Sequence, residues 1–120
     1  MGDEMKVAIV GSRHTNKSTQ EVFDIIDKYL PRGCSEIVSG GAIGIDTEAE
    51  KYAKKYNIPF TCFRPDYDAL GKTAPLARND KIIDYADYVI VIWDGSSRGS
   101  AYVIKRCIAV QKPMKVINLR

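Results

Sequence analysis

Two turns rich in glycine and serine contain the residues whose types and spacing could do chemistry. The first spans residues 39–46 (Ser-Gly-Gly-Ala-Ile-Gly-Ile-Asp) and precedes a helical pattern over residues 47–56. Glycines allow positive φ and leave backbone N–H groups open to a ligand, while the helix adds its unpaired N-terminal donors. This turn favours an anion or nucleotide site, although a tight strand-to-helix connection also requires glycine.

Asp46, which ends this first turn, has two alternative roles. At the start of a helix its carboxylate can cap backbone N–H groups. If it instead faces the ligand, we expect it to accept a hydrogen bond from a ribose or a base. A phosphate must then bind elsewhere, because two anions do not share one helix end.

The second turn precedes the last predicted helix and is the better candidate for a phosphate site. Ser96, Ser97, Gly99 and Ser100 supply backbone and hydroxyl donors at a helix N-terminus, and Arg98 adds a positive charge. A solvent-exposed loop position is the alternative for Arg98.

Arg13 and Arg78 are the other candidate cations for such a ligand. Arg78 lies early in a predicted helix, where its charge opposes the macrodipole, so we expect it to do more than stabilise that helix. Tyr67 and Trp93 could stack on a base, with a core position as the alternative for Trp93.

A hydrolase built on this chain would have to use carboxylates. His14 is the sole histidine, which argues against Ser-His-Asp or Cys-His catalysis and against a multi-histidine metal cluster. The carboxylate candidates are Asp46, Asp66, Asp68 and Asp94. The sequence lacks a complete G-x-G-x-x-G motif and a Gly-Lys-Ser/Thr run, which argues against a standard NAD dehydrogenase and a P-loop.

Hydrophobic periodicity predicts five strands that alternate with helices. The predicted strands are residues 6–10, 36–38, 60–63, 88–93 and 114–119. Helices are predicted from a capping box at Ser18 and Glu21 to residue 30, and over residues 47–56, 75–86 and 101–111. Residues 64–75 are predicted to be irregular. The positions that the first three helices should bury are Val22, Ile25, Ile26, Tyr29 and Leu30, then Ala49, Tyr52, Ala53 and Tyr56, and then Leu76, Ile82 and Ile83.

This order predicts an α/β fold: a Rossmann-like three-layer α/β/α arrangement around a five-stranded parallel sheet. We expect residues 1–120 to form a single domain. In such a sheet every loop that follows a strand lies along the same carboxyl edge. Residues 11–14, 39–46, 64–72 and 94–100 should therefore converge on one composite site.

Composition and charge set limits on the class of protein. The chain has 120 residues, a formal net charge of +3 and three cysteines without C-x-x-C spacing. These features predict a reduced cytoplasmic protein without a signal peptide, membrane segment, disulfide scaffold or zinc site. The mild charge argues against nucleic acid as a partner.

Three motifs resemble the SLOG superfamily of Rossmann-like domains, which includes the DNA-processing protein of natural transformation and the cytokinin-activating phosphoribohydrolases of the LOG family. These motifs are Gly11-Ser12-Arg13, the first turn from Ser39 to Asp46, and Ser97-Arg98-Gly99-Ser100. Residues 63–79 look like those of the YspA-like branch, with similar spacing of Asp66, Tyr67, Asp68, Gly71, Lys72 and the pair Arg78-Asn79.

The resemblance implies a nucleotide or nucleotide-derived ligand at the carboxyl edge. We expect no further cofactor and no metal. Tyr102 stands where the phosphoribohydrolases have a glutamate, which argues against their hydrolysis. We also expect the chain to lack the additional domains of the DNA-processing members.

The main hypothesis is a binding module or sensor for a nucleotide or nucleotide-derived small molecule. Its predicted ligand-binding residues are Gly11, Ser12, Arg13, Ser39, Gly40, Gly41, Gly44, Asp46, Arg78, Asn79, Ser97, Arg98, Gly99 and Ser100. The alternative is a hydrolase of an N-glycosidic or phosphoester bond, with Asp46, Asp66 and Arg78 as catalytic candidates. A third hypothesis is single-stranded nucleic-acid binding. The sequence leaves a homo-oligomer open.

Overall fold

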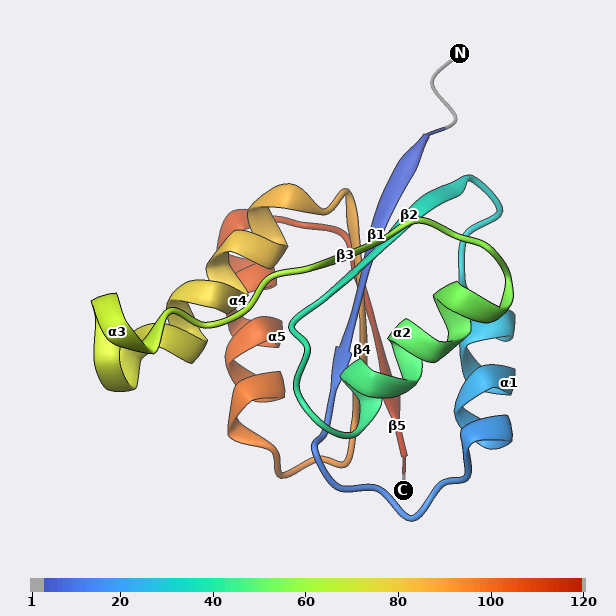
Figure 1. The fold of residues 1–120 in the computed structure, drawn as a ribbon, viewed down its shortest axis with the longest axis horizontal. Helices are drawn as coiled ribbons and strands as arrows, with labels where there is room; N and C mark the ends of the chain where they lie inside the picture. The colour runs from blue at the N-terminus through green and yellow to red at the C-terminus, as the bar shows by residue number, and fades with distance from the viewer. Residues whose placement is uncertain (1–3, 120) are drawn as a thin grey trace.

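Five parallel strands form the centre of the molecule (Figure 1). The computed structural model describes residues 4–119. The strands are β1 (Met5–Gly11), β2 (Cys34–Ser39), β3 (Phe60–Cys62), β4 (Tyr88–Trp93) and β5 (Met114–Asn118). Their order in the sheet is β3-β2-β1-β4-β5. The predicted parallel α/β fold is therefore confirmed.

Helices cover both faces of the sheet. They are α1 (Thr19–Tyr29), α2 (Ile45–Lys55), the short α3 (Tyr67–Leu70), the 3₁₀ turn η1 (Gly71–Thr73), α4 (Ala74–Tyr85) and α5 (Arg98–Val110). Figure 1 shows α1 and α2 on one side of the sheet and α4 and α5 on the other. No helix in the described part of the chain is both long and apolar enough to cross a lipid bilayer.

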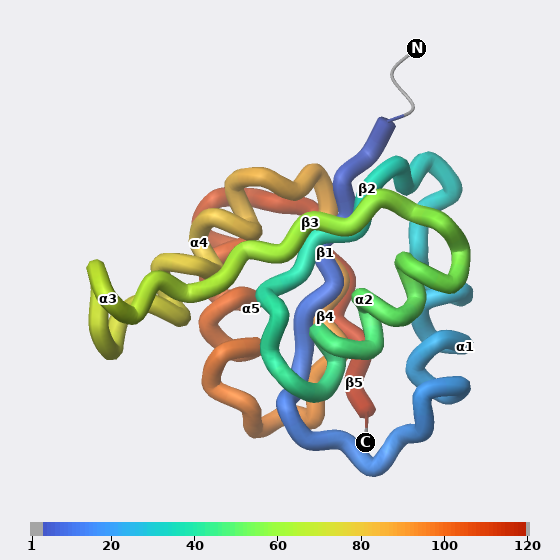
Figure 2. Tube along the Cα trace, in the orientation of Figure 1, coloured from blue at the N-terminus to red at the C-terminus, as the bar shows by residue number. Residues whose placement is uncertain are grey.

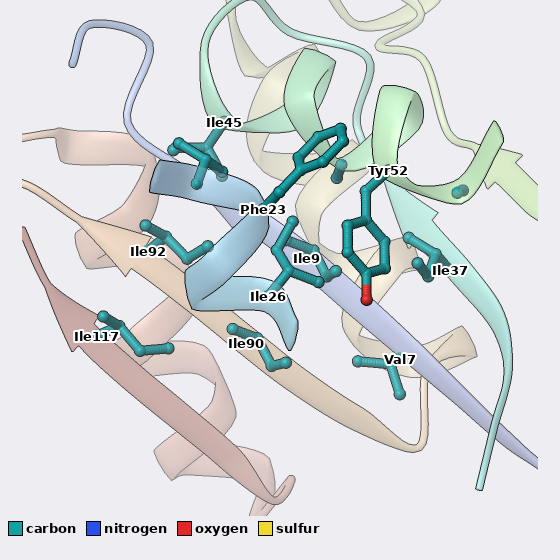
Figure 3. Close-up of a cluster of buried hydrophobic side chains, with 13 residues drawn as sticks. Val7, Ile9, Phe23, Ile26, Ile37, Ile45, Tyr52, Ile90, Ile92 and Ile117 are labelled. Atoms are coloured by element: carbon teal, nitrogen blue, oxygen red, sulfur yellow. The ribbon is translucent and has the colours of Figure 1, made fainter. Parts of the chain in front are cut away.

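The alternation of side chains along β1 divides the core into two layers. Val7 and Ile9 pack with α1 and α2, where Phe23, Ile26 and Tyr52 contribute large side chains (Figure 3). The intervening residues of β1 face α4 and α5 on the other side. A strand that is buried on both faces reads as a continuous apolar run, which is how β1 and β4 appear in the sequence.

Several predicted boundaries and burial positions differ from the structure. The predicted irregular segment contains α3 and η1, and α2 and α5 begin two and three residues earlier than predicted. The prediction that Tyr56 and Leu76 are buried is wrong, because they are 45% and 42% exposed. Tyr56 follows the last turn of α2, and Leu76 borders a surface pocket rather than the sheet.

β1 is the central strand, and later strands are added to the sheet on both of its sides. From β1 the chain builds β2 and β3 on one side, and then returns to place β4 and β5 on the other. Val7 of β1 lies opposite Tyr88 of β4 in this pairing. The segments that follow β1, β2 and β4 meet at the lower end of the sheet in Figure 2. Doubly wound folds bind their ligands at such a point.

Candidate functional site

A pocket of about 580 Å³ lies at the carboxyl edge, beside the ends of β1 and β4. Its volume is within the range of small-molecule and cofactor sites. The lining residues are Val10, Gly11, Arg13, Ala42, Asp46, Lys72, Pro75, Leu76, Arg78, Asn79, Ser97, Arg98, Gly99, Ser100 and Val103. Each of the four segments that were expected to converge contributes at least one of them.

Glycines of the first turn serve close packing within the protein. Gly44 is the N-cap residue of α2 and has a φ of 87°. A Cβ at Gly44 would lie 2.4 Å from the carbonyl oxygens of Ser12 and Arg13, and one at Gly40 would lie 2.6 Å from Nη1 of Arg78. The close approach that glycine permits here is therefore between two parts of the chain.

Asp46 is buried in the first turn of α2 and faces back toward the glycine-rich turn. Its Oδ2 accepts hydrogen bonds from the backbone N–H groups of Gly40 at 3.2 Å and Ala42 at 3.4 Å. Burial raises the pKa of Asp46 above its usual value, although the two amides and the charge of Arg78 act in the opposite direction. The carboxylate thus occupies the amides that a bound anion could otherwise use.

Arg78 connects three parts of the site from within α4. Its Nη1 donates to the carbonyl oxygens of Gly40 at 2.5 Å and Phe63 at 3.5 Å, and its Nε donates to Oδ1 of Asn79 at 2.8 Å. The residue is only 9% exposed. Arg78 therefore ties the turn after β2 and the end of β3 to α4, which accounts for a basic residue near a helix N-terminus.

The turn between β4 and α5 is ordered by Asp94. Its Oδ1 accepts from the backbone N–H groups of Ser96 at 2.8 Å and Ser97 at 3.0 Å, and these bonds lower the pKa of Asp94. The backbone N–H of Asp94 donates to Oγ of the buried Ser12, at 2.9 Å. Trp93 donates from Nε1 to the carbonyl oxygen of Ser97. The ends of β1 and β4 are therefore held together at the pocket.

Cations and apolar groups share the pocket lining. Arg13, Lys72 and Arg98 are exposed lining residues, and Arg78 is a buried one. Pro75, Leu76 and Val103 are among its apolar lining residues. Such a pocket can attract phosphate while offering apolar contact to a base or a sugar. Within residues 4–119 no three His, Cys, Asp or Glu side chains lie close enough to hold a metal ion.

The structure brings nine of the predicted binding residues into the pocket lining. They are Gly11, Arg13, Asp46, Arg78, Asn79, Ser97, Arg98, Gly99 and Ser100. Five others, Ser12, Ser39, Gly40, Gly41 and Gly44, lie outside the lining. Ser39 is buried and donates from Oγ to the carbonyl oxygen of Ile9. The catalytic candidate Asp66 also lies outside it and caps α3 through Ala69 N–H.

Sequence analysis missed the apolar side of the pocket. Ala42, Pro75, Leu76 and Val103 line it, as does Lys72, which had been noted only as part of the resemblance. Leu76 shares a helix with Ile82 and Ile83, so its periodicity suggested burial against the sheet. Leu76 instead lies in the first turn of α4, directly after η1, where it is exposed and lines the pocket.

Two solved structures share the fold. One, from a study of the single-stranded DNA binding mode of DNA processing protein A from Helicobacter pylori, has a TM-score of 0.73 and 27% sequence identity. The match covers 97% of this chain and 66% of that one. The other, DNA processing protein A from Streptococcus pneumoniae, has a TM-score of 0.76 at 24% identity. It covers 93% of this chain and 50% of that one. No curated protein matches the chain.

These comparisons correct the argument from net charge. We expected nucleic acid not to be a partner, and this is wrong, because the related protein from Helicobacter pylori binds single-stranded DNA. They also confirm the broader resemblance to the SLOG superfamily, whereas the YspA-like branch stays a prediction. A model of the DNA recombination-mediator protein A family matches residues 1–63, more than half of the chain. The chain therefore belongs to the DNA recombination-mediator protein A family.

Proposed function

We propose that this chain binds single-stranded DNA through the pocket at its carboxyl edge. The observation that carries the proposal is the gathering of four cationic side chains, Arg13, Lys72, Arg78 and Arg98, around one pocket that contains a single carboxylate, that of Asp46. The likeness to the DNA-binding protein from Helicobacter pylori supports DNA over a free small molecule. We further propose that residues 1–120 act as one binding unit.

The pocket favours a single strand over a duplex. At about 580 Å³ it can take one nucleotide at a time, and it is too small for a double helix. The cations can contact phosphates, while Leu76 and Val103 offer apolar surface to an unstacked base. Only the bases of a single strand are free to turn into such a pocket.

Fluorescence anisotropy with a labelled oligothymidylate of about 15 nucleotides tests the proposal. We expect Arg13→Ala and Arg98→Ala each to weaken binding by about 1 kcal/mol, roughly fivefold in Kd. Arg32→Ala is the matched control, because Arg32 is exposed in the connection from α1 to β2, at the opposite edge of the sheet. It should bind like the wild type.

Competition with mononucleotides distinguishes DNA from the sensor hypothesis. Thymidine monophosphate should displace the oligonucleotide only at concentrations far above the Kd of the oligonucleotide, because a strand can contact several cations at once. If one mononucleotide binds as tightly as the oligonucleotide, or if Arg32→Ala weakens binding as much as Arg13→Ala does, the proposal is wrong.

A further inference from the structure

The N-terminus of α5 presents hydrogen-bond donors to the pocket. Its N-cap residue, Ser97, makes no side-chain cap, and the N–H groups of the first turn have no acceptor within the helix. Gly99 lines the pocket at this turn, and a Cβ at this position would meet no atom within 4 Å. The helix dipole adds partial positive charge at the same place.

Ser100 provides a separate observation at this helix end. It lines the pocket and is 3% exposed, yet its Oγ has no hydrogen-bond partner among residues 4–119. A buried hydroxyl without a partner costs free energy and requires an explanation. An acceptor that belongs to a ligand in the pocket would supply the missing partner.

The other glycine-rich turn does not compete for an anionic ligand. There the amides of Gly40 and Ala42 already donate to the carboxylate of Asp46. On the α5 side two cations lie nearby, since Arg98 is in the first turn and Arg13 lines the same pocket. The carboxylate of Asp94 already accepts from the N–H groups of Ser96 and Ser97, which precede this first turn. Within residues 4–119, the first turn of α5 therefore offers an anion unbonded N–H donors beside two cations, which the first glycine-rich turn does not.

We infer that one phosphate group binds at the N-terminus of α5, where its oxygens accept hydrogen bonds from the Ser100 hydroxyl and the first-turn N–H groups. The inference rests on the proposed function for the source of that phosphate. An internal phosphodiester of single-stranded DNA and the phosphomonoester of a free nucleotide present the same acceptor oxygens, so the experiment must separate them.

Two variants alter the site and spare the fold. Ser100→Ala removes the hydroxyl, and Gly99→Asp places a carboxylate where the structure has open space. A negative charge in the first turn of a helix favours folding, so Gly99→Asp should unfold no earlier than the wild type. The matched controls are Ser35→Ala, near the start of β2, and Asn57→Asp, at an exposed position before β3, both on the opposite edge of the sheet.

Isothermal titration calorimetry with inorganic phosphate and with thymidine monophosphate measures the site directly. Ser100→Ala should raise the Kd about tenfold, and Gly99→Asp should abolish binding. Both controls should bind like the wild type, and thermal unfolding without ligand should show that all variants are folded. The inference is overturned if Gly99→Asp leaves the affinities for phosphate, thymidine monophosphate and oligothymidylate unchanged.

The labelled oligothymidylate separates the two sources of phosphate. Loss of its binding in Gly99→Asp assigns the phosphate to the DNA backbone. If the wild type binds thymidine monophosphate but not the oligonucleotide, and Gly99→Asp loses the former, the phosphate site stands and the proposed function is wrong. If the wild type binds the oligonucleotide and Gly99→Asp leaves the affinities for phosphate, thymidine monophosphate and the oligonucleotide unchanged, the phosphate site is wrong and the proposed function stays in place.

Discussion

Gly44 and Gly71 have similar backbone conformations in very different surroundings. Their φ values are 87° and 56°, and their ψ values are −129° and −130°. A Cβ at Gly44 would overlap the carbonyl oxygens of the turn after β1, whereas one at Gly71 would meet no atom within 4 Å. A side chain at either position would carry backbone strain, but only a side chain at Gly44 would also overlap other atoms. Comparing substitutions at the two glycines therefore separates the two costs.

Gly44→Ala should destabilise the protein more than Gly71→Ala does. Both substitutions carry the strain of a non-glycine residue at positive φ, about 1 to 3 kcal/mol. Gly44→Ala adds an overlap of roughly the same size, about 1 to 3 kcal/mol. Urea denaturation measures the difference between the two free energies of unfolding. If the two variants lose the same free energy of unfolding, the turn that contains Gly44 relaxes around the new methyl group.

Asp46 should make the stability of the protein depend on pH. Burial raises the pKa of its carboxyl above the ordinary 3.8. The folded state then holds this proton at pH values where the unfolded chain has released it. The stability contributed by the protonated form is complete below the unfolded pKa and is lost as pH rises through the folded pKa.

Asp46→Asn removes this titration. The free energy of unfolding of the wild type should therefore fall relative to that of Asp46→Asn as pH rises above about 4, by about 1.4 kcal/mol for each unit by which the pKa is raised. Urea denaturation between about pH 4 and pH 7 measures the difference. Asp84→Asn removes the same charge from an exposed position of α4 and is the control. The prediction is wrong if the free energy of unfolding of the wild type, relative to that of Asp46→Asn, stays constant or increases as pH rises.

Residue types predicted which turns contribute to the pocket, but they did not predict which side chains of those turns line it. Ser97, Gly99 and Ser100 were expected at the pocket and line it. Ser39 has the same chemical character, yet it is buried beside β1 and bonded to its backbone. Sequence spacing does not distinguish these positions, because the direction of a side chain in a turn depends on φ and ψ at each residue.

At the scale of elements, α1 has the clearest local signal in the chain. The Ser18 side chain accepts from the N–H of Glu21, and the Glu21 side chain accepts from the N–H of Ser18. This reciprocal pair determines where the helix begins, and the predicted capping box is confirmed.

Ser18→Ala should lower the free energy of unfolding by about 1 kcal/mol, because one N–H of the first turn loses its acceptor. Ser18→Asp keeps an acceptor at the N-cap position and should restore most of that loss. Chemical denaturation compares the two variants with the wild type. If Ser18→Asp is as unstable as Ser18→Ala, the cap is not the source of the effect.

The strands and the longer helices were predictable, whereas the short helical turns α3 and η1 were not. The strand at 88–93 was located without error, because six apolar residues in a row have few alternatives in an α/β chain. The four residues of α3 and the three of η1 are too short to show a helical period. Their positions depend on local bonds, such as the cap that Asp66 gives to α3.

For the whole molecule, the distribution of charge matters more than its sum. A net charge of +3 says little about DNA binding, because it averages over every face of the protein. The sheet brings Arg13, Lys72, Arg78 and Arg98 from separate parts of the chain to one edge. This gathering is a property of the topology, and composition cannot reveal it.

Salt should weaken DNA binding in proportion to the number of phosphate contacts. For single strands, the logarithm of the affinity should fall with the logarithm of salt concentration by a slope of about 0.7 per contact. Arg13→Ala should reduce the slope by about 0.7, whereas Arg32→Ala should not change it. Anisotropy titrations over a series of salt concentrations provide the slopes. An unchanged slope in Arg13→Ala would exclude a phosphate contact by this side chain.

The pairing of β1 with β4 has a consequence for the order of events during synthesis. The backbone N–H of Lys6 bonds to Asp87 across 81 residues, and one wall of the pocket comes from α5, later still. β1, α1, β2 and α2 are synthesised well before Asp87 and α5. A nascent chain therefore completes its ligand pocket only after α5 has been synthesised, so binding reports that the chain from β1 through α5 has emerged and folded.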